Sequence, residues 1–497
     1  MVSIVLACLM APLVKPNIVF IFTDDHAKQA ISAYGSKLMQ SPAIDSLAQE
    51  GVLFDRHYTS NPLCAPSRAS LLTGKLSHMN GHKDNASQFD GTQETFPKLL
   101  QKAGYQTAWI GKWHLESLPT GFDHWEILPG QGNYYNPDFI TSDGSHRETG
   151  YVTSLITDKA KTWLKDNSSK PFFLMVSHKA PHRSWHPGLD KLDLFANKRF
   201  PVPPDFNRDY KELNSGAERA TMRVSKDLNV ASDLLVDAPP ARLNAEQKAV
   251  WISKMARQDI EFKKRLSSGE TPGSVYYDRY IKDYLRCISS VDDSVGEILK
   301  SIEDLGLKKN TIVIYSSDQG FFLGEFGWFD KRWFYEPSAG TPLIVRWPGV
   351  VPGRVKSVTS NIDLAPTILD ALGIKPPPEM QGQSLCNIIK TKQSKSTQPF
   401  YGHFYESNDG EHHVPKAVTL IDKTYKLIFY YELNEWELFD IRTDKGEHRN
   451  LWKDPKSEAL RKRLVKKLIA TQKHYHEELE IIERTSKAAE QGPTISP

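Results

Sequence analysis

Four short runs of apolar and β-branched residues set the strongest limit on how this chain folds. They occupy residues 18–23, 107–110, 172–177 and 312–317. Each run lacks the polar alternation of a strand with one face in water, which is typical of strands buried on both faces of a parallel sheet. Segments with helical punctuation lie between the runs, so the sequence predicts a wound α/β architecture.

The spacing of capping residues and glycines predicts the helices and the domain limits. Helices are predicted at residues 41–51, 95–104 and 363–373, each opened by a capping residue and closed by a glycine. The stiff Lys375-Pro376-Pro377-Pro378 run predicts that the first domain covers residues 17–375. Residues 376–497 then form a smaller α+β domain, with strands at 416–431 and 435–441 and a charged helix at 456–483. The polar stretch 185–274 has no clear strand and is predicted to be a surface insertion of loops and helices.

Composition and charge exclude some classes of protein. A chain of 497 residues with 39% apolar content is long enough to bury a large core. Its 63 basic and 60 acidic residues give a net charge of only +3, without the basic stripe that a nucleic-acid binder needs, so nucleic acid is not an expected partner. The four cysteines are too scattered for a disulfide framework or a paired zinc site.

The N-terminal residues 1–16 resemble an export signal. Residues 2–14 form the one long apolar stretch, which is too short to span a bilayer but suits the apolar part of a secretory signal. We therefore expect a periplasmic or secreted protein without a transmembrane segment. The alternative is a buried N-terminal strand, since no basic residue directly follows Met1.

Charged and metal-binding side chains follow all four predicted strands. They are Asp24 and Asp25 after the first, Lys112 and His114 after the second, His178 and His182 after the third, and Asp318 and Gln319 after the fourth. Ligands of open parallel sheets bind outside the carboxyl ends of the strands. These side chains are therefore predicted to meet at one edge, although each alone has an ordinary structural explanation.

The oxygen-bearing residues of this set predict a metal site. Asp24, Asp25, Asp318 and Gln319 offer three carboxylates and one amide oxygen, which are hard ligands suited to calcium or magnesium rather than zinc. Calcium is favoured because its coordination is more flexible than the octahedron of magnesium. One ion is expected, with room for an oxygen from the nucleophile or the substrate.

The segment around Cys64 predicts an anion site at the start of a helix. Pro66 suits a first helical turn and Gly74 suits a helix end, so Cys64 is predicted at the helix N-terminus, where exposed amides favour an anion. Arg68 lies four residues later, on the same helix face, and offers a forked donor to an oxyanion.

This segment resembles the signature of the type I sulfatases. Residues 64–68 read C-x-P-S-R and continue as A-S-L-L-T-G, and further matches lie at residues 104–114, 180–182 and 317–320 and at Lys331. The resemblance runs from Asn17 to about Trp452. It implies an alkaline-phosphatase-like α/β domain, with a mixed, mostly parallel sheet between helices and a smaller C-terminal domain.

The same resemblance implies the chemistry of the site. In the family a maturation enzyme oxidises the signature cysteine to formylglycine, here Cys64, whose hydrate attacks the sulfur of a sulfate ester beside one calcium ion. The implied roles are calcium binding for Asp24, Asp25, Cys64, Asp318 and Gln319; positioning of the hydrate for Arg68; sulfate binding for Lys112 and Lys331; protonation of the leaving group by His182 or Lys331; proton removal by His114; and substrate contact for His178 and Arg183. Many members have Asn where Gln319 stands, which puts this ligand in doubt.

Two loops suggest the substrate. Residues 121–125 and 128–139 resemble loops of polysaccharide sulfatases, including N-acetylglucosamine-6-sulfatases, and their aromatic and amide side chains suit sugar binding or the packing of the loops themselves. A sulfated glycan is therefore the expected substrate. The adjacent His412 and His413 could reach the substrate, although a solvated strand end is the favoured expectation.

Two other functions fit the same residues. A phosphate- or phosphonate-ester hydrolase needs the same cations around its metal. A non-catalytic protein that binds sulfated glycans would keep Cys64 unmodified.

Overall fold

The four predicted strands are neighbours at the centre of one sheet. In a computed structural model that describes residues 15–393 and 398–491, the runs form β1 (Asn17–Thr23), β3 (Gln106–Lys112), β7 (Phe172–Ser177) and β8 (Thr311–Ser317). Their order is β8-β1-β7-β3, and every pair among them is parallel. The sequence prediction of a buried parallel sheet is confirmed for these strands.

Further strands extend this centre on both sides. They are β2 (Val52–Tyr58), β4 (His124–Leu128), β5 (Asp138–Thr141), β6 (Gly144–Arg147), β9 (Gly340–Thr341), β10 (Leu343–Arg346) and β11 (Gly353–Ser360). The full order is β11-β2-β10-β8-β1-β7-β3-β4-β5-β6, with β9 paired to β2. Antiparallel pairs join β10 to its neighbours, β4 to β5, and β5 to β6, so the sheet is parallel at its centre and mixed towards its edges.

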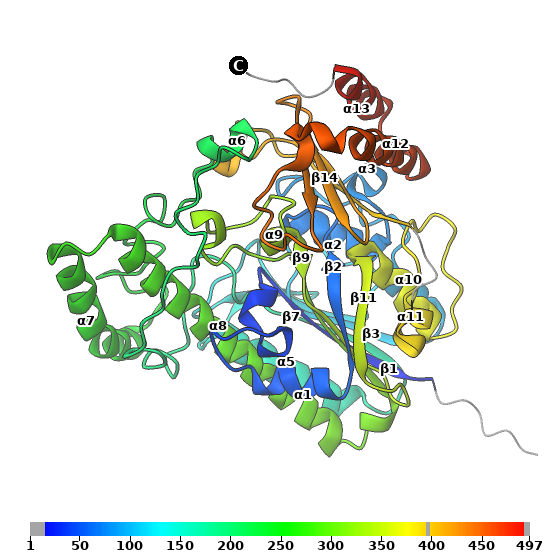
Figure 1. Ribbon diagram of the computed structural model, residues 1–497. Coiled ribbons are helices and arrows are strands. Elements are labelled where there is room, and N and C mark those ends of the chain that lie inside the picture. The colour runs from blue at the N-terminus through cyan, green and yellow to red at the C-terminus, as the bar shows by residue number, and fades with distance from the viewer. Residues whose placement is uncertain (1–14, 394–397, 492–497) are drawn as a thin grey trace, which may run out of the picture.

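Helices cover both faces of the sheet (Figure 1). One face packs against α1 (Pro42–Gln49), α5 (Val152–Asn167) and α8 (Pro272–Asp304), and the other against α2 (Cys64–Thr73), α4 (Phe96–Lys102) and α10 (Leu364–Ala371). Strand β1 shows why its run is continuously apolar. Val19 and Ile21 belong to the core on the α8 side, while Phe20 and Phe22 belong to the core on the α2 side.

The helices predicted at 41–51, 95–104 and 363–373 are observed as α1, α4 and α10, and the helix predicted to begin at Cys64 is observed as α2. The remaining α-helices are α3 (Ser77–Asn80), α6 (Ser215–Arg219), α7 (Ala245–Ser267), α9 (Glu336–Ala339), α11 (Cys386–Thr391), α12 (Glu458–His474) and α13 (Leu479–Gln491). Short 3-10 turns lie at Lys28–Ala30, Ser32–Tyr34, Lys308–Asn310, Glu325–Gly327, Asn361–Asp363, Glu411–His413, Leu451–Lys453 and Pro455–Ser457.

The stretch 185–274 is more than the surface insertion that was expected. Its last residues begin α8, the long helix that packs against the sheet. Trp185 and Trp251 are buried in the main core. Helix α7 extends away from the sheet, as expected of an insertion (Figure 1).

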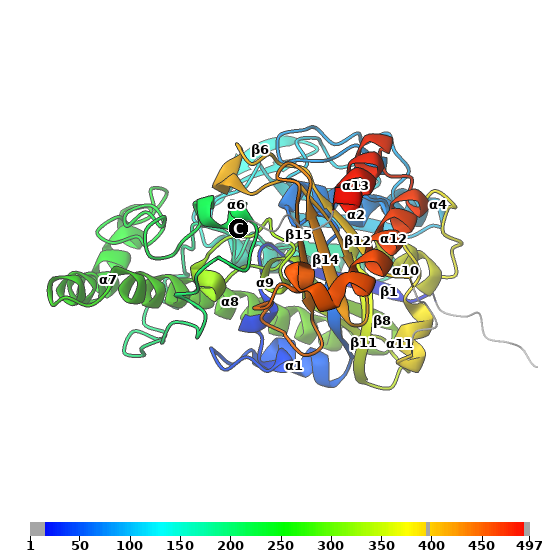
Figure 2. The ribbon, with the colours of Figure 1, turned by 45° about the horizontal axis from the view of Figure 1, so that its top comes forward.

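A separate four-stranded antiparallel sheet follows near the C-terminus. Its order is β12 (Phe400–Phe404), β13 (Ala417–Ile421), β14 (Tyr425–Tyr430) and β15 (Glu435–Asp440), and α12 and α13 lie against it (Figure 2). The single strand predicted at 416–431 is a hairpin, because the Asp422 carboxylate accepts the amides of Thr424 and Tyr425 at 2.9 Å and closes a turn. The helix predicted at 456–483 is likewise two helices, which meet between His474 and Leu479.

The N-terminal expectations fall mostly outside the described residues. Residues 1–14, which carry the predicted export signal, are not among them. Among the residues that are described, none of the helices combines the length and the apolar character needed to cross a bilayer. The domain limit at residue 375 stays a prediction.

The contact between the C-terminal sheet and the rest of the chain centres on a buried carboxyl group. Glu437 on β15 accepts hydrogen bonds from Tyr335 at 2.8 Å, from Tyr430 at 3.1 Å and from the backbone amide of Asn214 at 2.6 Å. Its side chain is fully buried. Burial raises the pKa of Glu437 to about 7, although these donors oppose the shift.

We expect Glu437→Gln to flatten the pH dependence of stability. The unfolded chain releases this proton near the ordinary pKa of glutamate, whereas the folded protein holds it to about pH 7. The folded state therefore binds more protons between these values, and its free energy of unfolding falls as the pH rises through them. At pH 8 the variant should be more stable than the wild type by on the order of 1–3 kcal/mol.

Urea unfolding at pH 5 and pH 8 measures this difference. The partly exposed Glu435 on the same strand provides the control, because Glu435→Gln should leave the pH dependence unchanged. Equal pH dependence in the wild type and Glu437→Gln would contradict the prediction.

Candidate active site

The four central strands bring their terminal side chains together around residue 64. Cys64 is the first residue of α2 and is fully buried. Its Sγ lies 3.4 Å from Asp24 Oδ1, 3.3 Å from Gln319 Nε2 and 3.3 Å from Lys331 Nζ. Helix α2 thus presents residue 64, from its N-terminus, to residues that follow β1 and β8.

Three buried carboxylates form the centre of the cluster. Ligand oxygens of Asp24, Asp25 and Asp318 all lie within 4.8 Å of one another. Each carboxylate faces one basic side chain: Asp24 binds Lys112, Asp25 binds Lys331 at 2.7 Å, and Asp318 binds Arg68 at 2.8 Å. These six charges balance, which allows them to be buried together.

Arg68 binds a carboxylate and the ends of the strands, and its role in positioning the hydrate stays a prediction. Its Nε and one terminal nitrogen donate to Asp318 Oδ2, and the other terminal nitrogen donates to the Lys112 carbonyl at 3.0 Å and to Ser177 Oγ at 2.9 Å. The guanidinium is therefore engaged by the ends of β3, β7 and β8 rather than by residue 64. Arg68 holds the carboxylate and the strand ends in position.

Gln319 belongs to the cluster. Its Nε2 donates to Asp25 Oδ1 at 2.6 Å, while its Oε1 is buried without a hydrogen-bond partner. Rotation of the amide by half a turn exchanges the two atoms and turns the oxygen towards the carboxylates. A buried amide oxygen without a donor beside three carboxylates fits a bound cation.

The thiol of Cys64 is a poor nucleophile as it stands. Burial raises its pKa to about 12, with the carboxylates of Asp318 and Asp25 adding to the effect and Lys331 opposing it. The thiolate is the reactive form of cysteine, so an unmodified Cys64 stays protonated and unreactive near neutral pH.

Two of the predicted histidines lie near the cluster. His182 has a ring nitrogen within 4.8 Å of both Cys64 Sγ and an Asp24 oxygen, and its Nε2 is 3.9 Å from Asp25 Oδ2. Its Nδ1 is bonded to the Arg183 carbonyl, which can only accept, so Nε2 carries the lone pair of the neutral ring. Burial, with the charge of Lys112, holds the pKa values of His182 and His114 well below the usual range.

His178 does not join the cluster, and its expected substrate contact stays a prediction. It is fully buried, and its Nε2 bonds to Ser294 Oγ of α8 at 3.0 Å. The helix layer beneath the sheet therefore holds this ring. The geometry favours His182 over His178 as the histidine that faces residue 64.

Sequence reasoning missed a charged group beside Lys331. Asp330 binds Arg332 and lies 3.2 Å from His412 Nε2 and 3.8 Å from Arg183. Arg183 is one-quarter exposed and also pairs with Asp233 at 2.8 Å. His412 is buried rather than at a solvated strand end, so the expectation for His412 is wrong. The Asp-Lys-Arg sequence at 330–332 was the available signal.

A second missed residue is Lys179. Its side chain is buried, its Nζ lies 4.9 Å from the centre of the Tyr134 ring, and in the described structure it makes neither a hydrogen bond nor an ion pair. Burial lowers its pKa to about 8, while the charge of Asp25 opposes the shift. Lys179 adds a cation to the balanced set of six charges, which makes the site more attractive to an anion.

The loop at residues 128–139 packs the site rather than offering open ring faces. Gln131 Oε1 accepts from Lys112 Nζ at 2.5 Å, and the Tyr134 hydroxyl donates to the His182 carbonyl at 2.7 Å. Tyr134 and Tyr135 are each only 2% exposed. Their rings are therefore unavailable for stacking on a sugar, and the amide of Gln131 is the part of the loop that reaches the cluster.

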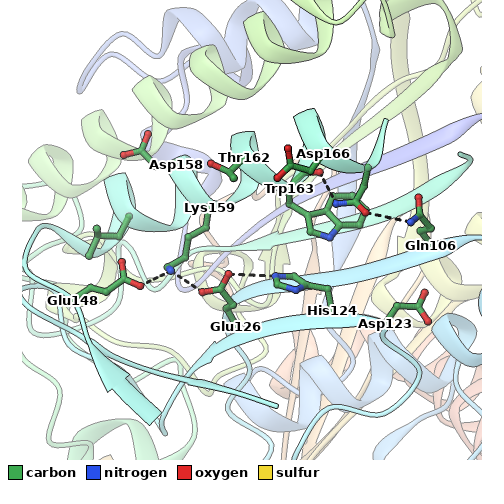
Figure 3. Close-up of a pocket in the computed structure, with 12 residues that line it drawn as sticks. Gln106, Asp123, His124, Glu126, Glu148, Asp158, Lys159, Thr162, Trp163 and Asp166 are labelled. Carbon is green, nitrogen blue, oxygen red and sulfur yellow. Dashed lines mark hydrogen bonds and ion pairs between the residues drawn. The ribbon is translucent and has the colours of Figure 1, made fainter. Parts of the chain in front are cut away.

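A second hollow lies at the opposite ends of β3 and β4. It has a volume of 580 Å³, and Gln106, Glu126, Glu148 and Lys159 are among its lining residues (Figure 3). Glu126, Glu148 and the nearby His146 have metal-ligand spacing, but Lys159 Nζ lies 2.6 Å from Glu126 and also pairs with Glu148. The lysine already neutralises these carboxylates, so the hollow does not match a cation site.

The comparisons with known proteins agree with this geometry. A family model described as sulfatase matches residues 16–374, and one described as the C-terminal part of N-sulphoglucosamine sulphohydrolase matches residues 324–474. The N-acetylglucosamine-6-O-sulfatase of Bacteroides thetaiotaomicron is 42% identical over 93% of this chain and 87% of its own length. The human N-acetylglucosamine-6-sulfatase is 29% identical over 76% of this chain and 64% of its own length.

A solved structure extends the likeness to the fold. It is a complex with its substrate D-glucosamine-2-N,6-O-disulfate, and it superposes with a TM-score of 0.90 at 41% identity, over 93% of this chain and 98% of that one. The two family models together match most of the chain. The matched residues include the sheet, the buried carboxylates around residue 64 and the signature segment. The chain belongs to the sulfatase family.

Proposed function

We propose that this protein hydrolyses a sulfate ester on a sulfated glucosamine, with the ester at O6, and releases inorganic sulfate. The observation that carries the proposal is the buried cluster of three carboxylates and three cations around residue 64. The relatives that are more than 40% identical and act on 6-O-sulfated glucosamine support the choice of sugar.

Residue 64 and a calcium ion supply the chemistry that the unmodified chain lacks. Formylglycine at residue 64 supplies, as its hydrate, one hydroxyl that attacks sulfur and a second whose deprotonation restores the aldehyde and expels sulfate. A calcium ion supplies positive charge that acidifies the attacking hydroxyl and binds a sulfate oxygen. The residues that would hold it are Asp24, Asp25, Asp318 and Gln319, and the unpartnered Gln319 oxygen supports this assignment.

The remaining side chains bind the sulfate and move protons. Lys331 ends beside residue 64, and Lys112 binds the Asp24 carboxylate that contacts residue 64; both lysines stabilise the negative charge that spreads over the sulfate oxygens. Although burial alone would lower it, the pKa of Lys331 is raised by the carboxylate of Asp25, so Lys331 carries a proton at neutral pH.

Two neutral rings complete the proton transfers. The lone pair of His182 Nε2 faces residue 64 and can take the proton of the attacking hydroxyl. The leaving oxygen receives its proton from Lys331, or from His182 after that transfer. The neutral His114 accepts the proton of the second hydroxyl in the release step.

The charged group beside Lys331 is proposed to bind the sugar. Asp330 and Arg332 flank the sulfate-binding lysine, and Arg183 and His412 contact Asp330 from two other parts of the chain. Carboxylate, guanidinium and imidazole groups held in one network suit the hydroxyls of a single pyranose ring. Arg183 thereby keeps its predicted substrate contact.

The maturation of the protein and its cellular location belong to the same proposal. We propose that a maturation enzyme converts Cys64, and that the protein works in the periplasm or outside the cell, where polymeric sulfated glycans are accessible. The apolar residues 2–14 support export.

Matched aryl sulfate and aryl phosphate esters, together with N-acetylglucosamine 6-sulfate, test the proposal. We expect kcat/KM for the sulfate ester to exceed that for the phosphate ester, and kcat/KM for the 6-sulfated sugar to exceed that for its 3-sulfated isomer. Faster phosphate release would instead support the phosphate-ester hydrolase. A protein with confirmed formylglycine that cleaves none of these esters would refute the proposed activity.

A further inference from the structure

A large groove in the described structure shares no residue with the catalytic cluster. It has a volume of 1360 Å³ and lies where β2 and β11 meet the turn between β13 and β14 and the segment after β15 (Figure 1). Arg56 and Lys356 line it from the two strands of the main sheet, and Lys423 and Lys445 line it from the C-terminal part. We call it the basic groove.

The basic groove carries an excess of positive charge. Eight basic and five acidic side chains line it, an excess of three positive charges. This local excess makes the groove attractive to polyanions.

The acidic residues of the groove already have partners, and three of the five are paired with basic side chains. Glu336 pairs with Lys28 at 2.7 Å, Glu447 with Lys426 at 2.5 Å and Asp55 with Arg354 at 2.5 Å. The other two, Asp205 and Glu325, accept hydrogen bonds from backbone amides. None of the five is left to hold the groove's outer lysines.

Three lysines of the groove are free to bind an external anion. Lys356, Lys423 and Lys445 are exposed, and in the described part of the chain their side chains make neither an ion pair nor a hydrogen bond. They come from β11, from the β13–β14 turn and from the segment after β15, so they line the groove from different elements. An extended anion would contact all three.

The other lining residues favour a carbohydrate over a nucleic acid. Tyr58 and Phe326 are each 1% exposed, so they offer no ring face on which a base can stack. Gln29, Ser357 and Gln393 provide amide and hydroxyl groups that can bond to sugar hydroxyls.

We infer that the basic groove is a second binding site, which holds a sulfated stretch of a polysaccharide chain outside the catalytic cluster. This inference rests on the proposed function, because a chain that carries many sulfates is then the natural ligand. The groove would raise the affinity for polymeric substrates and leave the chemistry at residue 64 unchanged.

The test compares two triple variants with the same change in net charge. Lys356→Glu/Lys423→Glu/Lys445→Glu reverses the free lysines of the groove. The control, Lys170→Glu/Lys248→Glu/Lys375→Glu, reverses three exposed lysines elsewhere that likewise have no ion-pair partner in the described structure. Unfolding midpoints establish that both variants fold.

Dextran sulfate serves as the probe, because it is a sulfated polysaccharide without 6-sulfated glucosamine. We expect the groove variant to bind it at least about ten-fold more weakly than the control at 0.15 M salt, with a shallower salt dependence. Excess N-acetylglucosamine 6-sulfate should not displace it. Equal affinity of the two variants would overturn the inference, and so would wild-type binding of duplex DNA as tight as that of dextran sulfate.

Measurements of turnover distinguish a failure of this inference from a failure of the proposed function. Both variants should hydrolyse N-acetylglucosamine 6-sulfate as the wild type does, while the groove variant should show a higher KM on a polymeric substrate. Absence of turnover by the wild type would refute the proposed function but leave the dextran sulfate result standing. If the folded groove variant no longer hydrolysed N-acetylglucosamine 6-sulfate, the inference that the groove and the catalytic cluster are separate sites would be wrong.

Discussion

Cys64→Ala is expected to reduce sulfate-ester turnover by at least ~10³-fold. The substitution removes the side chain that contacts Asp24 and Lys331, so no attacking oxygen can be formed at residue 64. Alanine is smaller than cysteine and leaves the ion pairs of the cluster in place. The fold should therefore persist while the chemistry stops.

Turnover is measured as the release of sulfate from N-acetylglucosamine 6-sulfate. The intact mass of the peptide that contains residue 64 shows whether this residue is cysteine or formylglycine in the wild type. The matched control is Cys287→Ala, which removes a second fully buried cysteine, one that lies on α8 with its Sγ 4.0 Å from the Tyr151 hydroxyl. This variant should keep near-normal turnover. Appreciable activity of Cys64→Ala, or a wild type that is active with an unmodified thiol, would contradict the covalent mechanism.

Removal of calcium is expected to abolish turnover and to lower the thermal midpoint of unfolding. An ion that binds the folded state but not the unfolded chain stabilises the fold by about 4 kcal/mol at a thousand-fold excess over its Kd. In its absence the oxygens of Asp24, Asp25 and Asp318, within 4.8 Å of one another, have only their basic partners to offset their repulsion.

Dialysis against a chelator, followed by metal analysis, prepares the protein for this measurement. Added calcium should restore both the turnover and the midpoint, and magnesium should restore less, because an irregular set of carboxylates and one amide suits calcium better. An unchanged midpoint in protein shown to be free of metal would contradict the assignment of these residues as ligands. Thermal scans of Cys64→Ala provide a control for stability, since that variant keeps all four proposed ligand side chains.

The centre of the fold could be predicted because its strands are buried on both faces. Such strands have continuous apolar runs, and the four runs identified in the sequence are the neighbouring strands β8, β1, β7 and β3. The edge strands, such as β6 with its four exposed residues, have no such pattern. Helix α8 escaped prediction because many of its buried residues are polar or charged, and their ion pairs appear only in three dimensions.

The candidate site was predictable where residues directly follow those strands. Asp24, Asp25, Lys112, Asp318 and Gln319 come together as expected because the carboxyl ends of parallel strands share one edge. His178 also follows a strand, yet its ring lies against Ser294, since the direction of a side chain beyond the strand end depends on the loop. His412 could not be placed because it is brought to Asp330 from the C-terminal part of the chain.

The zero exposure of Cys64 has a consequence for how an active population arises. Once α2 has docked against the ends of β1 and β8, the thiol lies out of reach of the active site of another protein. Under the proposed oxidation of residue 64, a molecule that folds with its thiol intact would stay inert for as long as it remains native. The proportion of working enzyme would then be set during synthesis and would not rise with age.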